Sequence, residues 1–410
     1  MFCTYLFTVT IYILPMNTKD TISSLSTDPV YKVTYGGWYQ RTTLHLSELY
    51  EFFANGNSYL KLDKAKLAQY RNAIEISSVT RELGYLEYVE LHTKSGVTVK
   101  YYEDGLYLLS IETADVPQSR EMLDNFYTQK LSPAVSYLFS LGAPTPKVLA
   151  NIKTHHPTVV TTTDDTVPSW LTGVYSSITA NGITVSKSPE YIYIKTDGTL
   201  GPTTSDLVDM QIFFREFKDQ LERYLNIHRT IWEEIERIRE ANTVKIKDIE
   251  NIRSKLDSYQ KTVSLITNRI NQMGSYARTR KAIAQNVGID QHMVSLFQYR
   301  FEVLLDTLDY IKEIWKMTSD YVASALQILV DANTAANTKS IQSLTMITSV
   351  GVIAGLIVHV SREAYPKFTL IGVSYLVGLF VAGWLLNFLV QRFTQNKKQR
   401  LKFKNVNKDL

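Results

Sequence analysis

Two apolar runs near the C-terminal end restrict the possible folds of this chain more than any other feature. Residues Leu344–Val360 (LTMITSVGVIAGLIVHV) are 17 positions in which His359 is the one ionisable side chain. Residues Phe368–Val390 are 23 positions without a formal charge. A helix that crosses a bilayer needs about 20 apolar residues. The sequence therefore predicts two transmembrane helices over 344–390, joined by the short turn 361–367.

The charges that flank these runs predict an orientation. The tail, residues 391–410, carries seven lysine and arginine residues against one acidic residue, Asp409. Because basic segments stay on the cytoplasmic side, the tail is expected there, and two spans return the N-terminal part to the same side. Mean hydropathy is −0.11 and 20% of residues are charged, so the rest of the chain has the composition of a soluble protein. We expect a multi-pass protein of the cell membrane with both termini in the cytoplasm.

The first 30 residues are an apolar segment followed by a loop. The segment MFCTYLFTVTIYILP resembles the core of a signal peptide, but it lacks a positive n-region and a small-residue cleavage pattern. A buried strand, or a true start at Met16, is the alternative interpretation. Cys3 is the single cysteine, which excludes an internal disulfide and a cysteine zinc site.

Residues 31–204 mix strand and helix patterns. Tyr85–Thr113 alternates between apolar and polar residues and contains Ser95-Gly96 and Asp104-Gly105, which predicts a β-meander. Val116–Ser140 is more helical, Gly173–Lys195 again predicts strands, and Thr158–Trp170 predicts a loop. The expected fold class is an α+β cytoplasmic head with antiparallel strands.

Residues 205–343 are predicted to form long helices, a bundle and a stalk. Helix breaks are expected at Asn242-Thr243 and at 286–290, with Asp290 as an N-cap. One helix is then expected from Gln291 through the first span. Its apolar seam is Phe297, Phe301, Leu304, Leu308, Ile311, Trp315, Thr318, Val322, Ala325, Leu329, Ala332 and Ala336. The seam indicates either contact between copies of the chain or a bundle within one chain. Its continuity with the first span favours a homo-oligomer.

This order of elements resembles the CorA family of divalent-cation channels over residues 205–402. The local match is best at Asn337–Thr345 (NTKSIQSLT), where the family has an Asn-rich stretch before Leu-Thr, and at the basic tail. The resemblance implies a homopentamer whose first span lines a pore, with magnesium as substrate and regulator. The family's Gly-Met-Asn signature is missing, and Arg362-Glu363-Ala364 stands at its place. Zinc, cobalt and nickel therefore remain open beside magnesium.

One face of the first span contains the candidate pore residues. They are Thr338, Ile341, Thr345, Thr348, Val352, Gly355 and His359, with Arg362 and Glu363 at the pore mouth. Hydroxyl oxygens suit a hydrated hard cation, and Val352 would form an apolar constriction. The alternative is helix packing, because Gly351 and Gly355 form a Gly-x-x-x-Gly pair and the hydroxyls can bond the preceding turn.

Two functions are consistent with these patterns. The first is a homo-oligomeric channel for divalent cations, and the second is a non-conducting, membrane-anchored scaffold or sensor. The expected partners are other copies of the chain and the lipid bilayer. A net charge of +4 gives no argument for nucleic acid. No nucleotide-binding loop, nucleophile elbow or zinc-protease helix occurs, so we expect neither an enzyme nor a resident cofactor.

Overall fold

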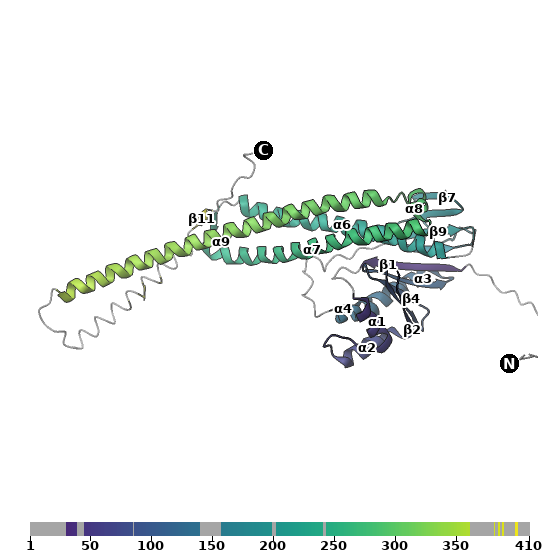
Figure 1. The fold of residues 1–410 in the computed structure, drawn as a ribbon, viewed down its shortest axis with the longest axis horizontal. Helices are drawn as coiled ribbons and strands as arrows, with labels where there is room; N and C mark the ends of the chain where they lie inside the picture. The colour runs from purple at the N-terminus through teal and green to yellow at the C-terminus, as the bar shows by residue number, and fades with distance from the viewer. Residues whose placement is uncertain are drawn as a thin grey trace, which may run out of the picture.

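The computed structural model describes residues 30–38, 45–84, 86–139, 157–198, 202–240, 243–360 and 398–400, and four positions between 381 and 388. A nine-stranded sheet lies at one end of a long helical bundle (Figure 1). The strands of the sheet are β1 (Tyr31–Trp38), β2 (Ile76–Glu82), β3 (Tyr88–Thr93), β4 (Thr98–Tyr102), β5 (Leu106–Thr113), β6 (Thr158–Thr162), β7 (Ser176–Ala180), β8 (Ile183–Lys187) and β9 (Tyr191–Thr196). The predicted segment 1–30 lies outside the described residues, apart from Val30.

The sheet is mixed, in the order β2-β3-β4-β5-β1-β6-β9-β8-β7. β6 and β9 are parallel and the other neighbours are antiparallel. The predicted purely antiparallel head is therefore wrong. The prediction of a loop from Thr158 is also wrong, because TVVTT forms β6 and all five residues are buried. The β-branched Thr and Val residues of TVVTT favour a strand. The prediction missed this preference because the polar Thr-Asp residues that follow are typical of a loop.

The turns of the head follow from glycine and asparagine. Gly96 and Gly105 have φ of 81° and 94° and connect β3, β4 and β5, as the predicted meander requires. Asn181 and Gly182, with φ of 51° and 75°, close the β7–β8 hairpin. Two positive φ values in sequence are typical of a tight type I′ turn.

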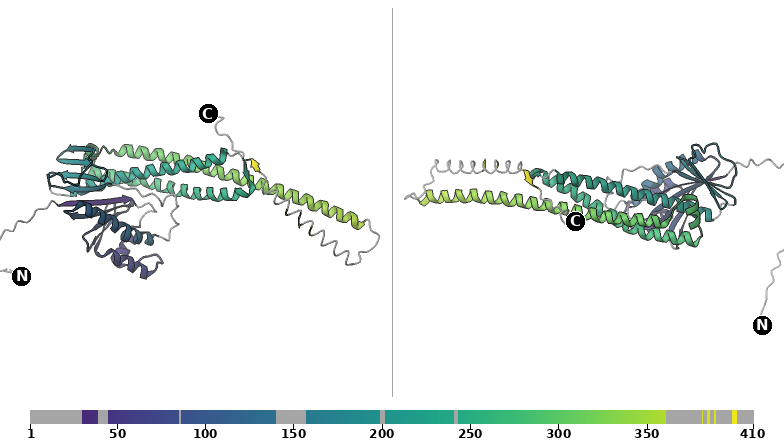
Figure 2. Two further views of the ribbon diagram at one scale, coloured as in Figure 1. Left: turned by 180° about the vertical axis from the view of Figure 1, so that it is seen from behind. Right: turned by 90° about the horizontal axis from the view of Figure 1, so that it is seen from above.

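Different helices cover the two faces of the sheet (Figures 1 and 2). One face packs on α1 (Leu46–Asn55), α2 (Lys64–Ile74), α3 (Val116–Phe126), the π-helix η1 (Tyr127–Leu131) and α4 (Ser132–Leu138). The other face packs on the bundle. Neighbouring residues of β5 show the division, because Leu109 joins the first core and Leu108 joins the second. This alternation is the two-residue period of a strand.

The bundle consists of α6 (Pro202–Glu240), α7 (Ile246–Asn286) and α9 (Phe301–Val360), with the short α8 (Asp290–Phe297) beside β7 and β8. The short strands β10 (Thr243–Lys245) and β11 (Lys398–Arg400) pair with each other, so three residues of the basic tail lie beside the α6–α7 connection. The breaks near 242 and 286 agree with the predictions. A single helix from Gln291 is wrong, because Gln298 has φ of 60° and ends α8. Asp290 is the first residue of α8 and not its cap.

The apolar seam of α9 is buried within one chain. Leu308, Ile311, Trp315 and Val322 are fully buried in the core that α9 shares with α6 and α7. The intramolecular alternative is therefore the one that the structure shows for these positions. The seam itself gives no argument for a homo-oligomer.

The last part of α9 extends beyond the ends of α6 and α7 (Figure 2). Among the seam residues whose side chains the structure describes, Leu329 is the last below 2% exposure. From Thr334 onward, every α9 residue whose side chain the structure describes is exposed. This projecting part contains most of the predicted pore residues.

Among the residues that the structure describes, no helix combines the length and apolar character that crossing a membrane requires. This finding contradicts the predicted transmembrane hairpin, and with it the CorA-like architecture, the ion channel and the multi-pass localisation. The first predicted span, Leu344–Val360, forms the end of α9, and its 17 residues are at the lower limit of what a bilayer core needs. The second, Phe368–Val390, lies outside the described residues except for four positions.

Candidate functional site

The predicted pore residues lie along the projecting part of α9. Thr338, Thr345, Thr348 and Gly355 are exposed, and Ile341 and Val352 are 65% and 62% exposed. His359 belongs to α9, but its side chain lies outside the description. The pore-mouth residues, Arg362 and Glu363, lie outside the described residues.

The hydroxyl groups of this stripe are satisfied by their own helix. Thr338 Oγ1 donates to Thr334 O at 2.9 Å, and Thr345 Oγ1 donates to Ile341 O at 2.9 Å. Thr348 Oγ1 donates to Thr345 O at 3.0 Å. Such bonds to the preceding turn use the hydroxyl proton, so these donors need no ligand. A Cβ at Gly351 or Gly355 would meet nothing within 4 Å among the described residues, so their predicted packing role stays a prediction.

A groove of about 410 Å³ runs along the bundle between α6 and α9. The α6 side consists of Leu225, His228, Arg229 and Trp232. The α9 side consists of Tyr310, Ile314 and Met317, of which Tyr310 and Met317 are 63% and 56% exposed. The groove therefore presents aromatic and apolar side chains, with one cation on its rim.

His228 fixes the level of α6 against α9. Its Nδ1 lies 2.6 Å from Thr318 Oγ1, and that hydroxyl donates its own proton to Ile314 O at 2.8 Å. His228 Nδ1 must therefore be the donor, which assigns the tautomer. Burial lowers the pKa of His228, and the neighbouring Arg229 lowers it further. A neutral imidazole is thereby favoured at the wall of the groove.

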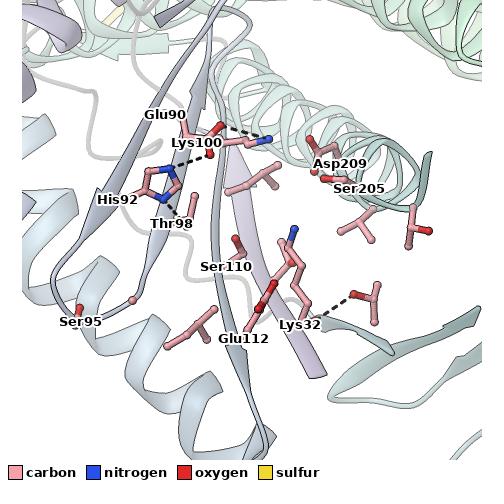
Figure 3. A pocket seen from close by; sticks show the side chains of 17 residues that line it. Lys32, Glu90, His92, Ser95, Thr98, Lys100, Ser110, Glu112, Ser205 and Asp209 are labelled. Atoms are coloured by element: carbon pink, nitrogen blue, oxygen red, sulfur yellow. Dashed lines mark hydrogen bonds and ion pairs between the residues drawn. The ribbon is translucent and has the colours of Figure 1, made fainter. Parts of the chain in front are cut away.

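A second hollow, the polar cleft, lies on the sheet beside the start of α6 (Figure 3). Its volume is about 630 Å³, and strands β1, β3, β4, β5 and β6 form its floor. The charged or titratable residues that line it are Lys32, Glu90, His92, Lys100, Glu112 and Asp209. Alternation explains this face, because Val99 and Tyr101 on β4 point into the opposite core while Thr98 and Lys100 point into the cleft.

Glu90 organises one side of the polar cleft. Its carboxylate lies 3.5 Å from His92 Nε2 and 3.6 Å from Lys100 Nζ. His92 Nδ1 is 2.9 Å from Thr98 Oγ1. Burial lowers the pKa of Lys100, but Asp209 and Glu90 outweigh burial, and the pKa is raised above its ordinary value. Lys100 therefore stays an ammonium group.

Asp209 connects the polar cleft to the core of the molecule. Tyr102 donates its hydroxyl proton to Asp209 Oδ2 at 2.6 Å. The Arg280 guanidinium of α7 lies 4.4 Å from the centre of the Tyr102 ring, and Arg280 Nε pairs with Asp104 Oδ2 at 2.9 Å. Desolvation raises the pKa of Tyr102 well above its ordinary value, and Asp209 raises it further. A chain of polar contacts thus runs from the cleft to the bundle.

The sequence did not single out the polar cleft. The alternation of Glu90 and His92 with apolar residues is a visible signal, but it equally describes a strand with one solvated face. Asp209 lies more than 100 residues away and reaches the cleft only because α6 crosses the sheet. No group of three or more His, Cys, Asp or Glu side chains within the described ranges could hold a metal ion.

Comparison with known proteins adds no relative. No family model matches this chain, and no curated protein or solved structure matches it either. The resemblance to the CorA family, and a divalent cation as substrate or regulator, therefore stay predictions.

Proposed function

We propose that this protein is a self-associating scaffold, in which α6 and α9 of one copy contact the same helices of a second copy. The observation that carries the proposal is a second heptad series on α9, outside the buried seam. It contains Val303, Tyr310, Met317, Ser324, Asp331, Thr338, Thr345 and Val352, and all eight are exposed. Helices associate through such a series where its members are apolar, and Val303, Tyr310 and Met317 are the apolar members that follow one another along α9, whereas Ser324, Asp331, Thr338 and Thr345 are polar.

The groove between α6 and α9 has the side chains of a protein interface. Trp232, Tyr310, Met317 and Arg229 belong to the residue types that are enriched at the centres of interfaces. The ring of Trp232 lies 4.5 Å from that of Tyr321, which holds the indole in place. A rigid aromatic wall loses little conformational freedom when a partner covers it.

Symmetry defines the geometry of the contact. α6 and α9 run in the same direction, because Tyr224, His228 and Trp232 contact Trp315, Thr318 and Tyr321 in that order. A two-fold axis along the groove then places α6 of each copy on α9 of the other, with all helices parallel.

Charge complementarity supports a second copy as the occupant. Within the described residues, the ion pairs of α9 involve Glu302 and Asp309, so Glu313 and Asp320 are unpaired in one chain. Among the residues that the structure describes, the ion pairs of α6 do not include Arg229. Since His228 is level with Thr318, the two-fold arrangement brings Arg229 close to the level of the partner's Asp320. Opposite charges then face each other across the contact.

The test is the mass of the full chain in solution, measured by sedimentation equilibrium from 1 to 100 μM. We expect twice the chain mass of 46.9 kDa for the unmodified protein. Met317→Glu, which places a charge in the groove, should give the mass of one chain with an unchanged circular dichroism spectrum. Val167→Glu is the control, because Val167 is 83% exposed and lies in the head.

Three outcomes would overturn the proposal. They are a single-chain mass for the unmodified protein throughout this range, equal masses for Met317→Glu and the unmodified protein, and dissociation of the control. A mass five times that of the chain would support the pentamer that the CorA resemblance implies, and it would exclude the two-fold contact.

A further inference from the structure

The polar cleft has the dimensions and the walls of a small-molecule site. Its volume of about 630 Å³ falls within the usual range for ligand sites. Its charged groups are partly buried, since the Lys100 and Glu90 side chains are 25% and 20% exposed and Asp209 is 9% exposed. The floor of the cleft beside them is also polar and buried, because Thr34 and Thr161 are 4% and 2% exposed. Keeping such groups on a half-buried surface costs stability, which a bound polar ligand would offset.

The lining residues exclude several ligand classes. No Phe, Tyr or Trp is among the described residues that line the polar cleft, so the small imidazole of His92 is the one ring there on which a nucleobase could stack, and a nucleotide is disfavoured. The carboxylates of Glu90, Glu112 and Asp209 outnumber the ammonium groups of Lys32 and Lys100. A multiply charged anion such as phosphate would therefore meet net repulsion. A ligand that carries one charge of each sign finds a partner for both.

Two of the charged groups retain free bonding capacity. Lys32 makes no ion pair within the described residues, although it stands opposite Glu112 in the β1–β5 register. From the described residues, Asp209 accepts one hydrogen bond, from Tyr102 on Oδ2, whereas a carboxylate accepts up to about four. Figure 3 shows Lys32 and Asp209 on opposite sides of the same opening, with Ser110 and Ser205 beside them.

We propose that the polar cleft binds a small zwitterion of the α-amino-acid type, whose carboxylate pairs with Lys32 and whose ammonium group pairs with Asp209. The hydroxyls of Ser110 and Ser205 supply further hydrogen bonds at the two ends. Lys100, already held by Glu90, lies on the same side of the cleft as Asp209 and adds a positive charge beside it. Through Tyr102 and Arg280, the occupied site is connected to α7 of the bundle.

The test is calorimetric titration of the full chain with each of the twenty common amino acids. For the amino acid that binds best, the matching amine without the carboxylate and the matching acid without the amine are titrated in parallel. We expect saturable binding of the amino acid and at least about tenfold weaker binding of both analogues, because each analogue leaves either the half-buried Lys32 or the buried Asp209 without its partner.

Variants identify the two contacts. Lys32→Met should weaken binding at least about tenfold, and Asp209→Asn, which keeps an acceptor for Tyr102, should do the same. Lys64→Met, an exposed lysine on α2, is the control and should bind as the unmodified protein does. Thermal unfolding of each variant confirms that the fold is kept.

The proposal is overturned if none of the twenty amino acids binds at 10 mM, a concentration at which a site with a Kd of about 1 mM would be about nine-tenths occupied. It is also overturned if either analogue binds as tightly as the amino acid, or if folded Lys32→Met binds unchanged. The mass of the oligomer is a separate measurement, so this test and that of the scaffold can fail independently.

Discussion

At the scale of single residues, the junction of sheet and bundle depends on one buried ion pair. Asp104 is fully buried, and its Oδ1 accepts the Leu106 amide at 2.9 Å while Oδ2 pairs with Arg280. Arg269 Nη2 donates to Asp104 O at 3.2 Å. Gly105 makes room for these cations, because a Cβ there would lie 2.8 Å from Arg269 Nη2. Burial lowers the pKa of Arg280, but Asp104, Tyr102 and Asp209 together outweigh burial and the pKa is raised.

Asp104→Ala should therefore be strongly destabilising. The substitution leaves Arg280 buried without its counter-charge, which costs about 3–5 kcal/mol of unfolding free energy. Urea denaturation followed by circular dichroism measures the difference. Asp165→Ala is the control, because Asp165 pairs with Lys195 at the surface and should leave the midpoint unchanged. A loss below about 1 kcal/mol for Asp104→Ala would show that the pair is not what fixes this junction.

At the scale of elements, α6 approaches β1 closely because Gly36 has no side chain. A Cβ at Gly36 would lie 2.6 Å from Leu108 Cδ2 and 2.9 Å from Ile212 Cγ2. On the same helix, Phe213 and Phe217 pack on Trp38 with ring centres 5.6 and 5.5 Å apart. The position of α6, and so one wall of both the polar cleft and the groove, depends on this approach.

Gly36→Ala should lower stability by about 1–3 kcal/mol, because α6 must move to admit the methyl group. The matched control is Gly84→Ala, where a Cβ meets nothing within 4 Å. Thermal unfolding of both variants gives the comparison. Equal midpoints for the two would mean that the helix has more freedom over β1 than the contacts indicate.

At the scale of the whole molecule, the polar cleft and the groove lie at different levels along the long axis of the bundle. The sheet lies at one end of the bundle and the exposed part of α9 at the other, with the groove between them (Figure 1). The ligand proposed for the polar cleft and the copy proposed for the groove would both contact α6. α6 is therefore the element through which a ligand bound in the polar cleft would change the affinity of one copy for another at the groove.

A charge exchange across the proposed contact tests the assembly. Arg229→Glu should weaken association about five- to tenfold, because it places like charges at the level of Asp320. Asp320→Arg alone should have a similar effect. Both substitutions in one chain restore opposite charges and should recover most of the affinity in sedimentation equilibrium. If the double variant associates no better than the single ones, the parallel two-fold arrangement is excluded.

The sequence predicted those parts of the fold that local pattern decides. The β-meander over β3–β5 was visible because Gly96 and Gly105 mark its turns between alternating strands. The helix breaks near 242 and 286 followed from weak helix formers. The candidate site was not predicted, because Lys32, Lys100 and Asp209 come from separate elements and each looks like an ordinary surface charge.

The sequence by itself determined where the long helices of the bundle and most strands lie, since hydrophobic period and turn residues act over a few positions, but it did not place α1 and α2. Only the tertiary structure decided what each apolar face contacts. The apolar seam of α9 suited either contact with another copy of the chain or contact with helices of the same chain. In the structure, α6 and α7 of the same chain cover it. The same holds for β6, whose central position depends on distant β1 and β9. Long-range contacts depend on shape and burial summed over the whole chain, which no local pattern contains.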